Sequence, residues 1–402
     1  MRRRRRTLLV ATVAALGLVA WVAASTGGSA NRTAATTGSP TASRTASSAG
    51  SPGSAGSAGS KGSAGPAGSS PSVVAAMARW QLPNALSRAG AAALPHGRVL
   101  LMGGLLASDT SSADVGVLDT STGKLTSVGS LASPTHDAAS AVLGGRALLF
   151  GGGQSTSVAT VEAVTLPGAA GTAAGTAAGA AGGSASGAAT SGVVVGQLPQ
   201  VRSDAEAVTV AGTTYVVGGY DGSTGDTAVL STQDGSSFST VVTLPVDVRY
   251  ATVAASGGKI YVFGGETVPG GTTLEYTTPS PTTSPPPGQQ VAVVQVIDPA
   301  THTAKVAGYL PRGVQGAAAF VLGGHLFLAG GDSYAPGSTP STGSTIWSFD
   351  PSTGKFRLVG HLAAPVSYAA VAVEGSTAWL IGGERDGVPV ASAQKVVLRS
   401  SH

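Results

Sequence analysis

A motif of glycine and apolar residues occurs six times along the chain, and it restricts the fold more than any other feature. Each copy is a short apolar run that ends in two adjacent glycines and begins just after a single glycine, as in the stretch GGKIYVFGG from Gly257 to Gly265. Glycine adopts the positive φ of a tight turn easily, and a glycine pair ends a strand. We therefore interpret each copy as a β-hairpin turn followed by a buried strand. The pairs begin at Gly103, Gly151, Gly218, Gly264, Gly330 and Gly382.

A second pattern runs in step with the first and supplies the remaining strands. Polar turns that start at an aspartate, such as DPATHTA at Asp298 and DPSTGKF at Asp350, are followed twelve residues later by Leu310 and Leu362. Together the two patterns predict four short strands in each unit, two around the glycine turn and two around the aspartate turn. A repeat of about 40–50 residues with four strands is typical of a propeller blade. The sequence thus predicts an all-β, six-bladed propeller.

The units resemble kelch repeats, whose marks are a double glycine, a Tyr-Asp-Pro-like turn and a later aromatic residue. The resemblance covers Met77 to Arg399. The double glycine is present in every unit, whereas the tyrosine position holds Leu118, Ile297 or Phe349. The resemblance implies a six-bladed kelch-type β-propeller in which the first strand of each blade lines a central channel. It also implies that the loops leading into these strands form a ligand-binding face.

The last unit lacks a fourth strand of its own. Its third strand is expected near Gln394–Leu398, and the apolar stretch Ala76–Leu82, before the first unit, ends in a leucine as the fourth strands do elsewhere. We expect Ala76–Leu82 to complete blade six, so that strands from both ends of the chain close the ring. Closure removes exposed sheet edges, which would otherwise pair with other chains.

The segments before the repeats have a different composition. Residues 2–6 are five arginines, and residues 7–24 are an apolar stretch long enough to span a membrane as a helix. We expect residues 1–24 to be either a signal anchor or a cleaved signal peptide, with the propeller outside the cytoplasm, at the cell membrane if anchored and secreted if cleaved. Residues 25–72 are almost entirely Ser, Gly, Ala, Thr and Pro, which predicts a disordered linker before a propeller domain at 73–402.

Two low-complexity insertions interrupt the propeller domain. The first, residues 168–191, is rich in alanine, glycine, threonine and serine, and it separates the third and fourth strands expected in blade two. The second, residues 267–290, contains PSPTTSPPPG and separates the second and third strands of blade four. We expect both to be disordered or extended, because neither composition can build a core.

Charge and cysteine content exclude several functions. The formal net charge of +4 depends on the five N-terminal arginines, because the rest of the chain has 18 basic residues against 19 acidic ones. We therefore expect no nucleic-acid partner. The absence of cysteine excludes disulfides and zinc–thiolate sites, and no histidine pair has the spacing of a metal site. No metal or cofactor is expected, and the propeller is expected to be a monomer.

The residues that lead into the first strands are candidates for a binding site at the channel mouth. Arg88, Arg202 and Arg249 match an arginine that often follows Leu-Pro in kelch repeats and that contacts an acidic partner in some members of the family. A guanidinium suits this role because it is always charged and can bind carboxylate or phosphate in bidentate fashion. The alternative is that each arginine pairs with a neighbouring blade. The full candidate set is Arg88, His136, Arg202, Asp204, Arg249, Tyr250 and Tyr368.

These features favour a binding protein over an enzyme. We expect an exported, membrane-tethered kelch propeller at the cell envelope that binds a protein or glycan with an anionic group through its loop face. One alternative is a propeller enzyme acting on a sugar, epimerase-like or lyase-like, without a cysteine-dependent copper cofactor; another is a surface-display element. No catalytic residue is predicted, since the sequence contains no phosphate-binding loop, HExxH motif or GxSxG serine motif.

Overall fold

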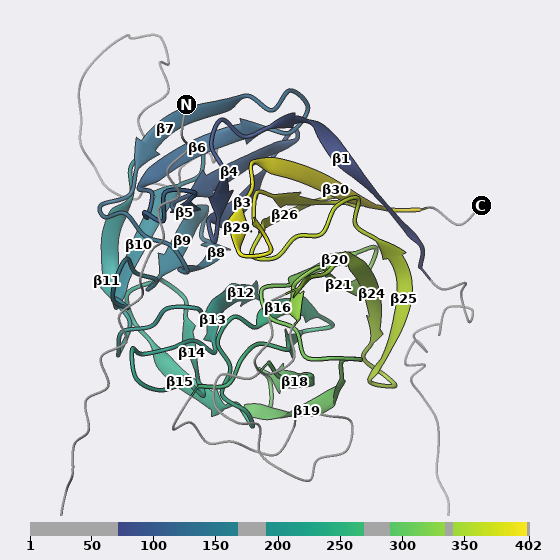
Figure 1. Ribbon diagram of the computed structural model, residues 1–402. Helices are drawn as coiled ribbons and strands as arrows, with labels where there is room; N and C mark the ends of the chain where they lie inside the picture. The colour runs from purple at the N-terminus through teal and green to yellow at the C-terminus, as the bar shows by residue number, and fades with distance from the viewer. Residues whose placement is uncertain (1–70, 168–189, 269–289, 334–340, 400–402) are drawn as a thin grey trace, which may run out of the picture. The chain divides into compact units, whose positions relative to one another are not determined.

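The computed structural model describes residues 71–167, 190–268, 290–333 and 341–399. The predicted signal segment, nearly all of the predicted linker and most of both insertions lie outside the described residues. The described residues form a six-bladed propeller, in which six four-stranded antiparallel sheets surround a central axis (Figure 1). No part of the described chain is helical, so none of it forms an apolar helix long enough to cross a membrane.

The blades follow one another along the chain, and each runs from an inner first strand to an outer fourth strand. Blade one contains β3 (Gly90–Leu94), β4 (Arg98–Met102), β6 (Asp114–Asp119) and β7 (Leu125–Ser130), and blade two contains β8 (Ala139–Leu143), β9 (Arg146–Phe150), β10 (Thr160–Thr165) and β11 (Val193–Gln197). Blade three contains β12 (Glu206–Val210), β13 (Thr213–Val217), β14 (Ala228–Thr232) and β15 (Ser239–Thr243), and blade four contains β16 (Thr252–Ser256), β17 (Lys259–Phe263), β18 (Val293–Asp298) and β19 (Thr303–Tyr309). Blade five contains β20 (Ala318–Leu322), β21 (His325–Ala329), β24 (Thr345–Asp350) and β25 (Lys355–His361).

Blade six is built from both ends of the propeller, as the sequence predicts. It contains β26 (Ala370–Glu374), β27 (Thr377–Ile381), β30 (Ser392–Leu398) and, as its outer strand, β1 (Val73–Gln81). Val73 pairs with Leu398 and Met77 with Gln394, so β1 begins three residues before the predicted start at Ala76. Short two-stranded ladders extend some loops: β2 (Leu86–Ser87) with β5 (Leu105–Leu106), β22 (Asp332–Ser333) with β23 (Ser341–Thr342), and β28 (Glu384–Arg385) with β29 (Val388–Pro389).

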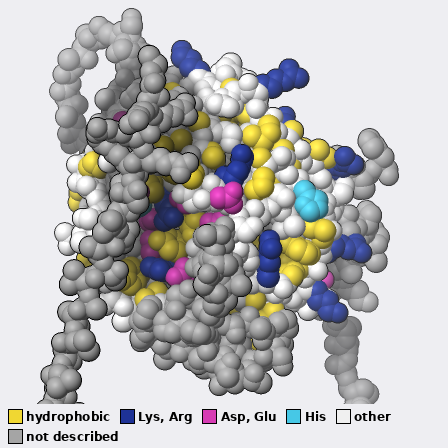
Figure 2. Space-filling model, viewed as in Figure 1, with side chains coloured by type: hydrophobic (Ala, Val, Ile, Leu, Met, Phe, Trp, Pro, Cys, Tyr) yellow, Lys and Arg dark blue, Asp and Glu magenta, His cyan; other side chains and the backbone are white. Residues whose placement is uncertain are grey.

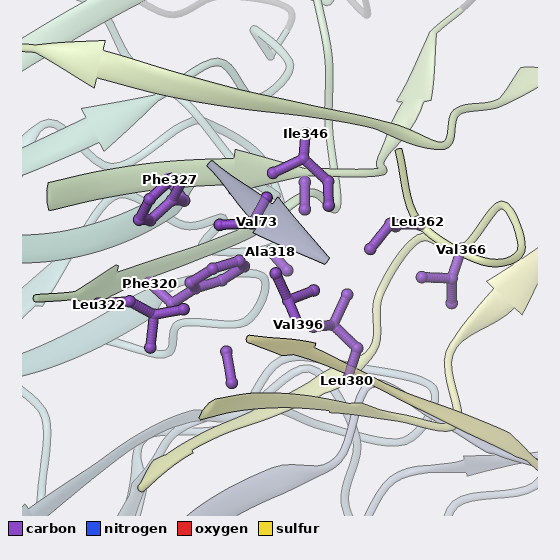
Figure 3. Packing of buried hydrophobic residues seen from close by; sticks show 12 residues of the cluster. Val73, Ala318, Phe320, Leu322, Phe327, Ile346, Leu362, Val366, Leu380 and Val396 are labelled. Carbon is purple, nitrogen blue, oxygen red and sulfur yellow. The ribbon is translucent and has the colours of Figure 1, made fainter. Parts of the chain in front are cut away.

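The apolar core of the propeller lies between neighbouring blades. The buried residues form separate clusters at the successive blade-to-blade contacts. Between blades five and six, Phe320 and Phe327 stack with their ring centroids 5.7 Å apart, and Leu380 and Val396 pack against the same cluster (Figure 3). Val73 of β1 belongs to this cluster, so the closing strand contributes to the core as well as to the ladder of blade six.

The glycine pairs join each blade to the next. The second glycine of every pair donates its N–H to a backbone carbonyl just before the first strand of the following blade, as Gly219 does to Val248 O at 2.8 Å. The first glycine lies so close to the same carbonyl that a Cβ at Gly218 would stand 2.5 Å from Val248 O. Both glycines also have positive φ, so any side chain here would meet strain and a steric clash together. The six hydrogen bonds run from Gly104 to Thr135, Gly152 to Arg202, Gly219 to Val248, Gly265 to Val314, Gly331 to Val366 and Gly383 to Leu86.

Two glycines with similar backbone angles allow the steric part of this effect to be measured. Gly218 has φ of 65° and faces Val248 O, whereas Gly257, in the hairpin turn of blade four, has φ of 58° and no atom within 4 Å of the point where a Cβ would stand. We predict that Gly257→Ala lowers the free energy of unfolding by about 1 kcal/mol, the cost of a left-handed alanine. Gly218→Ala should cost at least twice as much, as measured by chemical denaturation. Equal losses for the two variants would contradict the proposed role of the pair.

Candidate ligand site at the channel mouth

Six residues, one from each blade, surround the channel just before the first strands. All six have positive φ, between 50° for Tyr368 and 59° for Asp204. Each lies six residues after a buried leucine, such as Leu82 in front of Arg88, and directly before an alanine. The six are Arg88, Asp137, Asp204, Tyr250, Gly316 and Tyr368. We refer to them as the mouth ring.

The backbones of the mouth ring are joined in a closed circle. Each residue donates its N–H to the carbonyl of its counterpart in the preceding blade, as Tyr250 does to Asp204 O at 2.9 Å and Tyr368 does to Gly316 O at 2.7 Å. The circle closes where Arg88 N donates to Tyr368 O at 3.0 Å. The left-handed backbone that this geometry needs is costly for residues other than glycine, and such strain is common at functional sites. The circle thus fixes side chains from five blades around one opening.

The mouth ring opens onto a cavity of about 280 Å³ along the channel. Its wall is lined by small residues of the first strands, including Ala91, Ala207 and Ala319. Glu206 is the exception, since the other blades have glycine, alanine or threonine at the equivalent position. The cavity therefore has charged and aromatic side chains at its mouth, small apolar walls, and one carboxyl group farther in.

Arg88 contacts carboxylates and aromatic rings from several blades. Its Nη1 lies 3.0 Å from Asp137 Oδ2 in blade two, and its Nε lies 2.6 Å from Glu384 Oε1 in blade six. Its guanidinium also lies over the ring of Tyr368, 4.2 Å from the centroid, and 5.3 Å from that of Tyr250. Burial alone would lower the pKa of Arg88, but the two carboxylates raise it, so this arginine stays charged. Arg88 pairs with carboxylates of both neighbouring blades, which is the alternative considered for the arginines from the sequence.

Arg249 directly precedes Tyr250 of the mouth ring and has partners different from those of Arg88. Its Nη2 lies 2.9 Å from Glu266 Oε1, and its Nη1 lies 3.9 Å from Asp204 Oδ2. Its guanidinium is about 5 Å from the ring centroids of both Tyr220 and Tyr250. The side chain is 26% exposed, more than that of Arg88 at 18%, so Arg249 is the more accessible of the two cations.

Carboxyl groups outnumber guanidinium groups at the mouth. Burial, with a further contribution from Asp137, raises the pKa of Asp204 to about 7, although Arg249 and Arg88 oppose the shift. Burial also raises the pKa of Glu206 to about 7. Both groups therefore change protonation near neutral pH. On the face shown in Figure 2, acidic and basic side chains lie next to one another in a hollow.

The two tyrosines of the mouth ring contact each other beside Gly316, the ring residue of the blade between them. Their ring centroids are 5.4 Å apart with nearly perpendicular planes. Burial raises the pKa of Tyr250 and that of Tyr368, so both hydroxyl groups remain protonated at neutral pH and can donate hydrogen bonds.

The structure brings together six of the seven candidate residues. Arg88, Asp204, Tyr250 and Tyr368 line the channel cavity, and Arg249 lies beside it. His136 lies beside the mouth ring in blade two, where its Nδ1 is 2.8 Å from Ser111 Oγ and its Nε2 is 3.6 Å from Asp137 Oδ2. Sequence reasoning did not select Asp137, Glu206, Glu266 and Glu384.

The exception is Arg202, which does not reach the channel mouth. Its side chain is 1% exposed and donates to Gly218 O at 3.2 Å and Ala228 O at 3.0 Å within blade three. Its Nη2 pairs with Asp226 Oδ1 at 3.2 Å. The expected convergence of three guanidiniums on one opening is therefore wrong, and only Arg88 and Arg249 belong to the mouth.

The spacing from the preceding leucine explains this difference. The mouth ring always lies six residues after that leucine, and Arg88 satisfies this rule relative to Leu82. Arg249 lies five residues after Leu244, and Arg202 only four after Leu198. Arg249 thus lies one residue before the ring and still reaches the mouth, whereas Arg202 lies two residues before it and its side chain turns into blade three. Counting from the leucine would have placed Asp137 in the ring and excluded Arg202.

The described residues contain no group of three or more His, Asp or Glu side chains arranged to hold a metal ion. The mouth offers hydrogen-bonding groups to a ligand, with carboxylates as acceptors and tyrosine hydroxyls and guanidiniums as donors.

The raised pKa values predict how stability depends on pH. Glu206 has an ordinary pKa of 4.5 and a pKa of about 7 in the folded protein, so the folded state holds its proton more tightly than the unfolded state. This contribution is complete below pH 4.5 and is lost as pH rises through 7, a change on the order of 3 kcal/mol. We predict that Tm falls over this range and that Glu206→Gln falls less steeply. Parallel Tm profiles for the two proteins would show that Glu206 does not titrate in this way.

Comparisons with known proteins support the propeller fold. No protein-family model matches the chain, and no curated protein matches its sequence. The chain is similar to a solved structure described as "Structure of YjhT", with a TM-score of 0.61 and 17% sequence identity. The similarity covers 80% of this chain and 99% of that one. At this identity the likeness shows a shared propeller fold.

Proposed function

We propose that the protein is a binding module whose channel mouth holds a hydroxyl-rich ligand, such as the exposed end of a glycan. The observation that carries this proposal is the mouth ring. Its backbone circle presents Arg88, Asp137, Asp204, Tyr250 and Tyr368 around one cavity with small apolar walls. Concave sites with a few well-placed polar groups and aromatic faces are typical of ligand binding in folded proteins.

The charges at the mouth suit hydroxyl groups better than an anion. Each of the two guanidiniums already contacts carboxylates, whereas an anionic ligand would have to compete with those partners or displace them. Hydroxyl groups can donate to Asp137 and Asp204 and accept from the tyrosines and arginines at the same time. A neutral glycan therefore takes the place of the anionic partner that the sequence suggested.

This proposal predicts a selective effect of substitutions at the mouth. We expect binding of one or a few neutral glycans on a glycan array, confirmed by calorimetry. Tyr250→Phe should weaken binding roughly tenfold through the loss of one hydroxyl contact. The matched control is Arg146→Met at the opposite end of blade two, where the guanidinium donates to Asp234 O. Binding that survives Tyr250→Phe but is lost in Arg146→Met would place the site on the other face.

A second candidate is an enzyme that acts on the same sugar. It is favoured by Asp204 and Glu206, because carboxyl groups with pKa near 7 are suited to proton transfer at neutral pH. NMR spectra of the bound glycan over time distinguish the two functions. Spectra that stay unchanged support the binding module. A new sugar signal that is absent with Glu206→Gln, while binding is retained, would establish the enzyme.

We also propose that the propeller lies outside the cytoplasm, held by residues 7–24 at the cell membrane. Five arginines before an apolar stretch of this length favour export of everything that follows. A reporter enzyme that works only in the cytoplasm, fused after His402, should be inactive. An active reporter would contradict export. Fractionation then separates the two alternatives, since protein in the membrane fraction indicates an anchor and soluble protein starting near Ser25 indicates cleavage.

A further inference from the structure

A second cavity lies in blade one, away from the channel. Its volume is about 260 Å³, and it lies beneath the chain that leads into blade one, against β4, β6 and β7. Most of its walls are apolar, with Leu86, Leu101 and Leu125 among them. The exposed residues Asn84, Asp114 and Ser127 also line it, so the cavity can be reached from solvent.

The repeat shows why this cavity is apolar. One position of the third strand can be compared between blades. Its residue pairs with the second-strand residue that lies two positions before the glycine pair, as Glu162 pairs with Leu149 in front of Gly151. In blades two, four and six this residue is Glu162, Gln295 or Gln394. Each of these side chains is buried and accepts a hydrogen bond from the backbone leading into its own blade. Glu162 accepts from Ala132 N at 2.8 Å, Gln295 from Val246 N at 2.9 Å, and Gln394 from Ala363 N at 3.0 Å.

Blade one has Gly116 at this position, paired with Leu101. Gly116 contributes no side chain to this space, and Leu125 of β7 packs against it instead, with its Cδ1 2.8 Å from the point where a Cβ would stand. Blade two serves as an internal comparison, because it has a cavity of about 300 Å³ at the corresponding place. That cavity is lined by Glu162 and several hydroxyl side chains. Replacing a carboxylate by glycine therefore changes the chemistry of the cavity from polar to apolar.

The size and rim of the cavity in blade one define what it can hold. An apolar protein cavity of about 150 Å³ already accepts a benzene ring, so this larger one has room for an aromatic group. Asp114 lies at the exposed rim, and its carboxylate has no cationic partner among the described residues. An ammonium group on the ligand would complete that pair.

We propose that blade one contains a second ligand site for a small hydrophobic amine. The aromatic or branched apolar part occupies the cavity between Leu86, Leu101 and Leu125, and the ammonium group pairs with Asp114. The site is independent of the channel mouth, which is lined by other residues.

A pair of indoles with opposite charges tests the proposal. Calorimetry and ligand-observed NMR on the full chain would compare tryptamine with indole-3-propionate, which share a ring system. We expect tryptamine to bind at least tenfold more tightly, and Asp114→Asn to remove most of that difference. Equal affinities for the two compounds, or no binding of tryptamine at millimolar concentration, would overturn the proposal.

Variants of the cavity locate the binding site. Gly116→Gln installs the side chain found in blades four and six, and we expect it to reduce tryptamine affinity at least tenfold. A Cβ at Gly116 would lie 2.8 Å from Leu125 Cδ1, the movable end of a side chain, so the substitution should be accommodated. Ser127→Phe fills the cavity from the exposed strand β7 and provides a second variant if Gly116→Gln does not fold.

The control removes a carboxylate from the channel mouth instead. Asp204→Asn should leave tryptamine affinity unchanged, because Asp204 lines only the channel cavity. Loss of tryptamine binding in Asp204→Asn, with binding retained in Gly116→Gln and Ser127→Phe, would place the amine at the mouth and overturn the proposal. Loss only in the two cavity variants would establish the site in blade one.

Discussion

The propeller depends on backbone hydrogen bonds that pass from each blade to the next. One circle joins the left-handed residues of the mouth ring, and a second set joins each glycine pair to the following blade. These bonds pair backbone N–H and carbonyl groups that lie just before the first strands, which are the inner edges of the six sheets. The apolar clusters between blades supply burial, but the hydrogen bonds fix the rotation of one blade relative to the next. Because the circle is closed, a change in one blade affects both of its neighbours.

The same constraint creates the candidate binding site. Hydrogen bonds on both sides hold each ring residue in the left-handed region, so the backbone and not the side chain sets its position. The mouth ring therefore tolerates arginine, aspartate, tyrosine and glycine at equivalent positions. The side chains at these positions, rather than the backbone circle, give the mouth its chemistry. The alanines that follow keep the channel open, and Glu206 adds a buried carboxyl group to an otherwise small wall.

Buried polar groups have two different roles in this molecule. Arg202 and Asp226 form a buried ion pair inside blade three, and Gln295 and Gln394 accept hydrogen bonds from backbone groups beneath the incoming chain. Arg88 and Arg249 also pair with carboxylates, but they remain partly exposed beside a cavity. Charge and residue type are the same for all three arginines, so only burial and partners distinguish a structural arginine from one available to a ligand.

Local spacing in the chain is enough to specify the blades, the hairpins and the closure of the ring. A glycine turn, an apolar run and a glycine pair specify a hairpin wherever they occur, and the unit lacking a fourth strand identifies its missing partner, β1. The composition of the mouth depends instead on the tertiary structure. Arg249 lies one residue before its blade's position in the mouth ring, and Arg202 lies two residues before its own. A shift of one residue along the chain changes the direction in which a side chain points. The carboxylates that pair with the arginines come from other blades, and the cavity over Gly116 is visible only when blades are compared in space. Such contacts join residues far apart in the chain, so local spacing does not reveal them.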